Sequence, residues 1–356
     1  MRIWHLNLTR AVLRVDGIPT AVRRLAAAQQ ALGADVDVFS GGGPAAVTGV
    51  RDRLARAGVR PDTVHFHSVF RPLHALVARR LVELGVPYVV SPHSGYAPES
   101  LARRQLLKRP YTQLVERRFV AAAGAASCLT EAERDDLRRF SPAFSGPAVV
   151  VPNVLDKVSP TNLWAPPSGG RPQVVTLCRY DVRQKGLDRL AALARCCPEI
   201  DFTVYGEQDK NEGFLTDRLR RLAPPNFLLR PPVFGPDKEA VVAGASVFML
   251  LSRWEGLSMS LVEALGAGVP CAVSTYVGRT LPALGEGAGL VLDDDAGAAA
   301  VQLRSLIANR ARLVAVSEAG KAYAAAAFRP DEVARRTLEC YRGLTPASPV
   351  PAGSSR

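Results

Sequence analysis

The chain has 356 residues, a formal net charge of +12 and a hydrophobic content of 47%. That length exceeds one typical domain and suits two, each large enough to bury a core. No apolar stretch reaches the roughly 18 residues of a membrane-spanning helix, and the opening MRIWHLNLTR lacks a signal peptide's apolar core. Six cysteines without a C-x-x-C pair fit a reducing compartment, so we expect a cytoplasmic protein.

The first half alternates short apolar strands with helical patterns, beginning with a helix expected over residues 20–34 that ends at Gly33. Short strands separated by helices of this length predict a doubly wound parallel sheet. The expected strands cover residues 3–6, 36–39, 63–67, 87–91, 126–130 and 148–151.

The stretch 101–119, LARRQLLKRPYTQLVERRF, concentrates the positive charge of the first half. Residues 1–165 hold 22 Lys and Arg against 13 Asp and Glu. We expect Pro110 to divide this stretch into two short helices. These helices could lie on the anionic inner face of a membrane. The alternative is a helix face that is exposed to solvent. Few aromatic residues and no known module argue against nucleic acid. The cations are Arg103, Arg104, Lys108, Arg109, Arg117 and Arg118.

The second half repeats the alternation after TNLWAPPSGGRPQ, a Pro- and Gly-rich segment that is typical of an interdomain linker. The sequence therefore predicts an α/β protein with two Rossmann-like domains that face each other across a cleft. The domain bounds are 1–165 and 166–329, followed by a last helix at 330–344 and a disordered tail at 345–356. The strands of the second half are expected at 174–177, 202–205, 227–230, 247–251 and 271–274.

Two glutamates, Glu255 and Glu263, follow the strand at 247–251 and flank the start of a predicted helix. Open α/β sheets bind ligands at the carboxyl ends of their strands. The intervening N–H groups lie at an electropositive helix start that suits a diphosphate, while the carboxylates can accept hydrogen bonds from a sugar and a ribose. The residues that supply this backbone are Gly256, Leu257 and Ser258.

Ser260 and Glu263 offer an alternative, because S-x-x-E is also a capping box that needs no ligand. That interpretation leaves Glu255 unexplained. Glu255 precedes the cap and adjoins Gly256, which allows a ligand to approach the backbone closely.

Arg179 and Lys185 form a basic pair after the strand at 174–177. Both side chains can converge on a pair of phosphates. The alternative is that they are ordinary surface charges. Fixed cations stabilise the charge that develops on a departing diphosphate. The acidic run at 293–295 is interpreted as a polar turn and not as a metal site.

All five histidines fall within the first 93 residues. His65 and His67 alternate along a strand and face the same side, which raises the question of a metal. No Cys or carboxylate cluster accompanies them, so we expect no metal. His93 follows the strand at 87–91 and is a candidate to hydrogen-bond a sugar hydroxyl, with an ordinary loop histidine as the alternative.

Six segments of the sequence resemble motifs of the retaining GT-B glycosyltransferases of family 4. They occur in the order that is usual for that family, and together they span nearly the whole chain. The spaced pair in EGLSMSLVE is similar to the hallmark of that family. The other segments are DGIP at 16–19, PHSGY at 92–96, SCLTEAERDDL at 127–137, VPNVLD at 151–156 and LCRYDVRQKGLDRL at 177–190.

The resemblance implies a GT-B fold and a retaining, metal-independent hexosyltransferase without a bound cofactor. The co-substrate is a UDP- or GDP-linked sugar, and the acceptor is a glycan or lipid-linked hydroxyl of surface polysaccharide or glycolipid synthesis. The departing diphosphate helps to deprotonate the acceptor.

The resemblance also implies roles for single residues. Arg179 and Lys185 hold the diphosphate. Glu255 contacts the donor sugar and Glu263 contacts the nucleotide ribose. His93 orients the sugar.

Three departures from the family pattern support an alternative function, a non-catalytic GT-B partner that binds a nucleotide or glycan. Cys178 replaces a glycine, Asp16 precedes Gly17 in the loop expected to approach the diphosphate, and Val154 follows Asn153 where glycine is common. A second alternative is a sugar-nucleotide epimerase, which shares the two-domain architecture.

Overall fold

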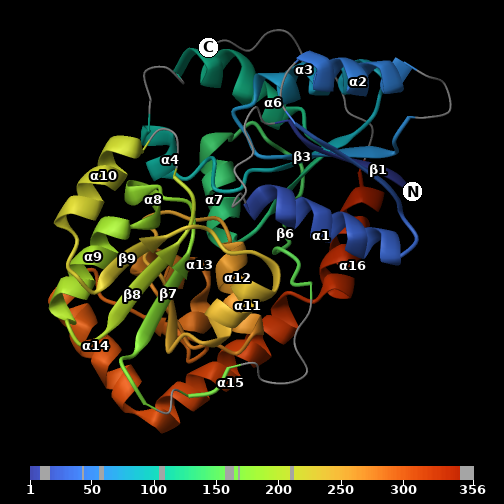
Figure 1. Cartoon of the computed structure of the whole chain (residues 1–356). Coiled ribbons are helices and arrows are strands. Elements are labelled where there is room, and N and C mark those ends of the chain that lie inside the picture. The colour runs from blue at the N-terminus through green and yellow to red at the C-terminus, as the bar shows by residue number, and fades with distance from the viewer. Residues whose placement is uncertain are drawn as a thin grey trace. The chain divides into compact units, whose positions relative to one another are not determined.

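The computed structural model describes residues 1–8, 17–41, 44–55, 60–103, 109–156, 164–166, 169–208 and 212–344 (Figure 1). The chain divides into two compact units. The first unit contains Ile18–Val154, the strand before it and the helix that starts at Pro330; the second contains Leu155–Arg329. The change of unit at 154–155 lies ahead of the boundary at 165 that the sequence predicts.

The first unit is built on a sheet of six parallel strands in the order β2-β1-β3-β4-β5-β6. Buried, β-branched-rich strands of this kind are typical of parallel sheets covered on both faces. His5 lies opposite His65, and His67 opposite Ser91, in the register of β1, β3 and β4. The strands are β1 (Arg2–Asn7), β2 (Asp35–Ser40), β3 (Thr63–His67), β4 (Tyr88–Ser91), β5 (Ala125–Cys128) and β6 (Ala148–Val150).

Helices α1 (Gly17–Ala31) and α16 (Pro330–Arg342) cover one face of this sheet and lie side by side. Helix α1 ends near Gly33, whose φ of 83° is one that glycine adopts without strain. From α16, Leu338 and Tyr341 pack with Ile3 of β1. The last helix of the described chain is therefore part of the first unit's core.

The opposite face carries the larger hydrophobic core, which includes Trp4, Phe66 and Leu81. Pro72 opens α3 at a position where the missing N–H costs nothing. The Thr130 hydroxyl caps α7 by accepting the N–H of Glu133. The helices of this part are α2 (Pro44–Ala55), α3 (Pro72–Glu83), α4 (Pro98–Ala102), η1 (Thr112–Glu116, a π turn), α6 (Arg117–Ala121) and α7 (Glu131–Phe140).

The stretch 101–119 holds the end of α4 at Ala102 and a helical run over 109–121. Residues 104–108 lie outside the described chain, so the division expected at Pro110 stays a prediction. Arg109, Pro110 and Tyr111 are helical and run on through η1 and α6 to Ala121. Arg104 and Lys108 lie outside the described residues, as does the expected tail at 345–356.

The second unit has its own sheet of six parallel strands in the order β12-β11-β10-β7-β8-β9. The chain moves outward from β7 to β9 in one direction and then returns to β10 on the other side of β7. The carboxyl ends of β7 and β10 are therefore a topological switch point. The strands are β7 (Gln173–Leu177), β8 (Asp201–Tyr205), β9 (Phe227–Arg230), β10 (Val247–Leu250), β11 (Cys271–Val273) and β12 (Leu290–Val291).

Side-chain caps begin several helices of the second unit, as with Asp181 before α8 and Ser274 before α13. Trp164, within the expected linker, is buried and donates from Nε1 to the Ala245 carbonyl at 2.7 Å, so this part of the segment packs into the second unit. The helices are α8 (Val182–Lys185), α9 (Leu187–Cys196), α10 (Gly213–Leu222), α11 (Gly235–Ala243), α12 (Met259–Gly266), α13 (Thr275–Thr280), η2 (Pro282–Leu284, a 3₁₀ turn), α14 (Ala296–Ala308) and α15 (Arg310–Ala327).

Candidate functional site

Lys185 and Glu255 form an ion pair at the switch point of the second unit. The Lys185 Nζ lies 2.5 Å from the Glu255 Oε2, and their side chains are only 11% and 13% exposed. The Ser252 hydroxyl donates to the same oxygen at 3.0 Å. Two donors therefore fix the carboxylate, and the lysine is held where β7 and β10 end.

Gly186 explains how Lys185 reaches this position. Its φ is 65°, and a Cβ added there would lie 2.1 Å from the Leu251 carbonyl oxygen. Only glycine allows the turn after α8 to pack against the end of β10. The packing of two backbones thus sets the position of the lysine.

Arg179 lies on the same connection, between β7 and α8. Its Nη2 donates to the Gln184 Oε1 at 3.3 Å, and the Gln184 N–H donates to the capping carboxylate of Asp181 at 2.9 Å. Arg179 is half-buried. Arg179 and Lys185 therefore flank one short turn, and Gln184 supports Arg179, which the sequence did not indicate.

Glu263 pairs with a residue that the sequence analysis missed. The Lys238 Nζ of α11 lies 3.0 Å from both carboxylate oxygens of Glu263 on α12. The contact joins two helices that are separate in the sequence, so no local motif signals it. Lysine is scarce beside arginine in this chain, which is the one feature that could have drawn attention to Lys238.

The capping-box interpretation of Ser260 and Glu263 is wrong. Helix α12 has Ser258 as its N-cap, without a side-chain cap hydrogen bond. The Ser260 hydroxyl donates to the Leu177 carbonyl of β7 at 2.9 Å instead. Both polar groups are engaged by tertiary contacts, which outweigh the local pattern.

Gly256, Leu257 and Ser258 are buried and connect Glu255 to the start of α12. The first N–H groups of a helix have no intrahelical acceptor and carry partial positive charge. The start of α12 at its N-cap Ser258 therefore presents partial positive charge that suits an anion.

The acidic run at 293–295 serves the fold. Asp295 caps α14 by accepting the Ala298 N–H at 2.9 Å. Asp294 accepts from Arg189 at 3.2 Å and from Thr275 at 3.1 Å. These contacts agree with a polar turn.

In the first unit, His93 lies in a strained loop after β4. His93 and Ser94 have φ values of 48° and 60°, which cost other residues more than glycine. Glu133 of α7 accepts the Ser94 N–H and, at 2.5 Å, the Leu129 N–H. Burial raises the pKa of Glu133 to about 7. A buried carboxyl thus holds the loop that presents His93.

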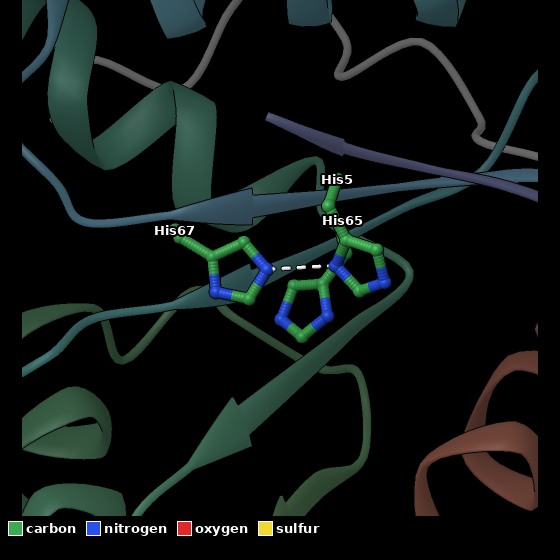
Figure 2. A group of neighbouring side chains, drawn as sticks. All are labelled: His5, His65 and His67. Carbon is green, nitrogen blue, oxygen red and sulfur yellow. Dashed lines mark hydrogen bonds between the residues drawn. The ribbon is translucent and has the colours of Figure 1, made fainter. Parts of the chain in front are cut away.

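His93 ends a group of imidazoles that point toward one another. The His5 Nδ1 lies 2.8 Å from the His67 Nε2 (Figure 2). The His67 Nδ1 lies 3.3 Å from the His93 Nε2, and His65 stacks on His67 with ring centroids 4.2 Å apart. Ligand atoms of His5, His65 and His67 lie within 4.8 Å of one another. Strand register brings His5 into this group, which the sequence did not reveal.

Burial determines the charge of these rings. It lowers the pKa of His5 and of His93 to about 4. It also lowers the pKa values of His65 and His67 well below 6.5, with neighbouring imidazoles adding to the effect. All four rings are therefore neutral at pH 7. Beside them is a cavity of about 20 Å³ lined by His65, His67, His93 and Asn153, with room for one water molecule.

Cys178 directly precedes Arg179, and Val154 helps to line the cavity beside the histidines. Gly17 is the first residue of α1, and Asp16 lies outside the described residues. Cys178 is buried, which raises the pKa of its thiol to about 12 and makes it unreactive. Val154 is 2% exposed within the core of the first unit.

Basic side chains of the stretch 101–119 line the outside of the first unit. Arg109, Arg117 and Arg118 are exposed, and Leu114 among them is 62% exposed. The Arg117 guanidinium lies 6.0 Å from the centre of the Phe140 ring. Within the described residues, no helix is long and apolar enough to cross a membrane.

Two family profiles match the chain. Residues 40–154 match the family "Glycosyl transferase 4-like domain", and residues 171–309 match "Glycosyl transferases group 1". The second match covers the lysine–glutamate pairs, and the first covers His65, His67 and His93.

The chain is also similar to characterised proteins along most of its length. It is 28% identical over 314 residues to the alpha-maltose-1-phosphate synthase of Mycolicibacterium smegmatis, covering 79% of each chain. It is 26% identical over 370 residues to the lipopolysaccharide core biosynthesis mannosyltransferase LpsB of Rhizobium meliloti, covering 93% of this chain and 95% of LpsB.

Solved structures share the fold at low sequence identity. The sucrose-phosphate synthase of Thermosynechococcus elongatus superposes with a TM-score of 0.79 at 19% identity, covering 96% of this chain and 98% of its own. Anabaena HepE, solved with UDP-glucose, has a TM-score of 0.74 at 17% identity, covering 97% and 100%. The two Rossmann-like units are thus those of the GT-B fold.

Proposed function

Because the chain belongs to the glycosyltransferases of group 1, which transfer a sugar from a nucleotide donor, we propose that it moves a hexose from UDP or GDP to an acceptor hydroxyl with retention of configuration. The observation that carries this proposal is the ion pair of Lys185 and Glu255 at the switch point, next to the start of α12. It combines a cation for phosphate with a carboxylate for hydroxyls.

The residues of the second unit divide the donor between them. Lys185 and Arg179, with the N–H groups at 256–258, hold the diphosphate, whose charge increases as the sugar leaves. Glu255 accepts hydrogen bonds from the donor sugar and also fixes Lys185. Glu263, oriented by Lys238, accepts the ribose hydroxyls.

In this proposal the protein needs neither a metal nor a bound cofactor. Fixed cations and helix N–H groups stabilise the departing diphosphate. The leaving phosphate oxygen takes up the acceptor proton, so no protein carboxylate acts as a nucleophile. His93 orients a hydroxyl of the donor sugar, and Gly17 allows its loop to approach the diphosphate.

Calorimetric titration tests the donor site. UDP, GDP, ADP and their hexose conjugates are titrated in EDTA into the wild type, Arg179→Ala and the matched control Arg183→Ala, whose exposed side chain lies on the same turn. We expect one nucleotide to bind to the wild type and the control but at least about tenfold more weakly to Arg179→Ala. Donor isomerised without acceptor product would identify an epimerase, and absence of nucleotide binding would identify a scaffold.

We further propose that the acceptor is glycan or lipid-linked, belongs to surface polysaccharide or glycolipid synthesis, and is met at the inner membrane face of the cytoplasm. The exposed cations Arg109 and Arg118, with Leu114 between them, support this proposal. The doubly substituted protein Arg109→Glu/Arg118→Glu should lose co-sedimentation with anionic vesicles. The matched control Arg218→Glu/Arg221→Glu on α10 should retain it. No vesicle binding by the wild type at low salt would contradict the membrane proposal.

A further inference from the structure

A continuous series of hydrogen bonds leads from the Ser127 carbonyl of β5 to His93. The first links join Ser127 to Ser91 at 2.8 Å, Ser91 to His65 at 2.7 Å, and His65 to Tyr341 at 2.5 Å. Gln29 follows at 3.4 Å from the Tyr341 hydroxyl. The partners come from β5, β4, β3, α16 and α1 of the first unit.

The second half of the series runs through three imidazoles. The Gln29 Oε1 lies 2.8 Å from the His5 Nε2. The His5 Nδ1 then meets the His67 Nε2 at 2.8 Å, the contact drawn in Figure 2, and the His67 Nδ1 meets the His93 Nε2 at 3.3 Å. Each group bonds to the next.

The Ser127 carbonyl fixes the direction in which the hydrogen bonds of the first half of the series are donated. A backbone carbonyl can only accept, so the Ser91 hydroxyl donates its one hydrogen to Ser127. The Ser91 oxygen must then accept from the His65 Nε2–H. A neutral imidazole carries one hydrogen, so the His65 Nδ1 accepts from the Tyr341 hydroxyl. Burial raises the pKa of Tyr341 and keeps that hydroxyl protonated.

The donor and acceptor roles in the first half determine those in the second half. Because the Tyr341 hydrogen is used on His65, its oxygen accepts from the Gln29 amide nitrogen, and the Gln29 oxygen therefore faces His5. The His5 Nε2–H donates to that oxygen, leaving its Nδ1 to accept from the His67 Nε2–H. The His67 Nδ1 in turn accepts from the His93 Nε2–H.

We propose that this series holds His93 in the Nε2–H tautomer and leaves its Nδ1 as a hydrogen-bond acceptor. His5, His65, His67, Gln29 and Tyr341 are then positioning residues that act through His93. The ligand group that His93 recognises is a donor, such as a hydroxyl, and not a phosphate oxygen. Assigning that hydroxyl to a sugar rests on the proposed function; the tautomer itself does not.

The same chain contains an internal reference. The His74 Nε2 accepts the Leu8 N–H at 3.0 Å, and the His74 Nδ1 faces the Ser68 carbonyl at 3.3 Å. Since a carbonyl accepts only, His74 must carry its hydrogen on Nδ1. The tautomer of His74 is therefore opposite to the one inferred for the other four histidines.

Nitrogen-15 NMR of histidine-labelled protein at pH 7, without nucleotide, tests the inference. Single substitutions assign the five rings. We expect four Nε2–H tautomers, at His5, His65, His67 and His93, and one Nδ1–H tautomer, at His74. An Nδ1–H form of His93 would overturn the proposal. So would nitrogen-15 shifts on addition of zinc that show ring nitrogens of His5, His65 and His67 bound to the metal, because those nitrogens would then not be hydrogen-bonded to one another.

Tyr341→Phe is the decisive variant, because it keeps the ring and removes the hydroxyl that passes the direction from His65 to Gln29. We expect His93 to become a mixture of tautomers, with at least a tenth in the Nδ1–H form. Tyr323→Phe, which alters a tyrosine packed on Phe328 in the second unit, is the matched control and should leave the spectrum unchanged. A pure Nε2–H form in Tyr341→Phe would contradict the inferred transmission. The spectra need no turnover, so this result is independent of whether sugar transfer is found.

Discussion

The two units use opposite means to order polar groups in similar sheets. The first unit joins neutral imidazoles, an amide and hydroxyls from His5 to His93 by directional hydrogen bonds. The second unit pairs full charges, Lys185 with Glu255 and Lys238 with Glu263. Neutral groups define where hydrogens point, and ion pairs define where charge is placed. The first unit therefore offers neutral acceptors and donors, whereas the second offers cations that suit phosphates beside carboxylates that suit hydroxyls.

The largest expected difference between the units is their response to acid. The five histidines lie in the first unit, and burial lowers their pKa values, to about 4 for His5 and about 3 for His74. A lowered pKa gives stability that is complete above pH 6.5 and is lost as the pH falls toward 4. Three buried carboxyls have the opposite effect, because their raised pKa values make the folded unit less stable as the pH rises. They are Glu116, Glu133 with a pKa of about 7, and Asp136 with a pKa of about 6.

Five imidazoles outnumber three carboxyls, so unfolding of the first unit takes up roughly two protons between pH 6 and 5. We expect its opening free energy to fall by up to about 3 kcal/mol over that unit of pH. Hydrogen exchange of amides in β1 and β3, corrected for intrinsic rates, measures this change. Amides in β7 and β8 serve as the internal control and should keep their opening free energy. Equal changes of opening free energy in both units would contradict the expected difference in their response to acid.

The next largest effect is expected in the ion pairs of the second unit. Lys185→Ala removes a cation and leaves Glu255 unpaired near the phosphates, so kcat/KM should fall by about 10² to 10³. Arg183→Ala on the same turn should stay within about twofold of the wild type, and circular dichroism should show an intact fold in both. Wild-type turnover in Lys185→Ala would remove the proposed role of this pair.

A smaller effect is expected at the more exposed pair. Lys238 is 30% exposed and Glu263 17%, so solvent weakens their interaction. Lys238→Ala should raise KM for the nucleotide sugar by about threefold to tenfold with little change in kcat, because it removes the cation that orients Glu263, which the proposed function assigns to the non-reacting ribose. Lys238→Met, which keeps the length of the side chain, should behave like Lys238→Ala. A fall in kcat alone would show that Lys238 acts on the transferred sugar.

The fold followed from the sequence because each strand is a short apolar run between helices. Strand β12 was missed because it spans only two residues, Leu290–Val291. The side of the sheet that His65 and His67 share was evident from their alternation. The contact between His5 and His67 was not, since it depends on β1 lying next to β3.

The candidate site shows the same limit. Glu255 and Lys185 were found from their places after strands, but the bond between them depends on how Gly186 packs against β10. The capping box failed because Ser260 has a better partner in β7. Local patterns identified candidate polar groups at the ends of strands, and tertiary packing decided their partners.

Tyr341 is synthesised long after the other members of the series of hydrogen bonds. It is separated from His65 by 276 residues. A ribosome that adds 5 to 20 residues per second needs about 15 to 55 seconds for that interval. The strands of the first unit emerge long before the helix that completes their polar interior, so His93 of a nascent chain acquires its fixed hydrogen only when translation has passed Tyr341.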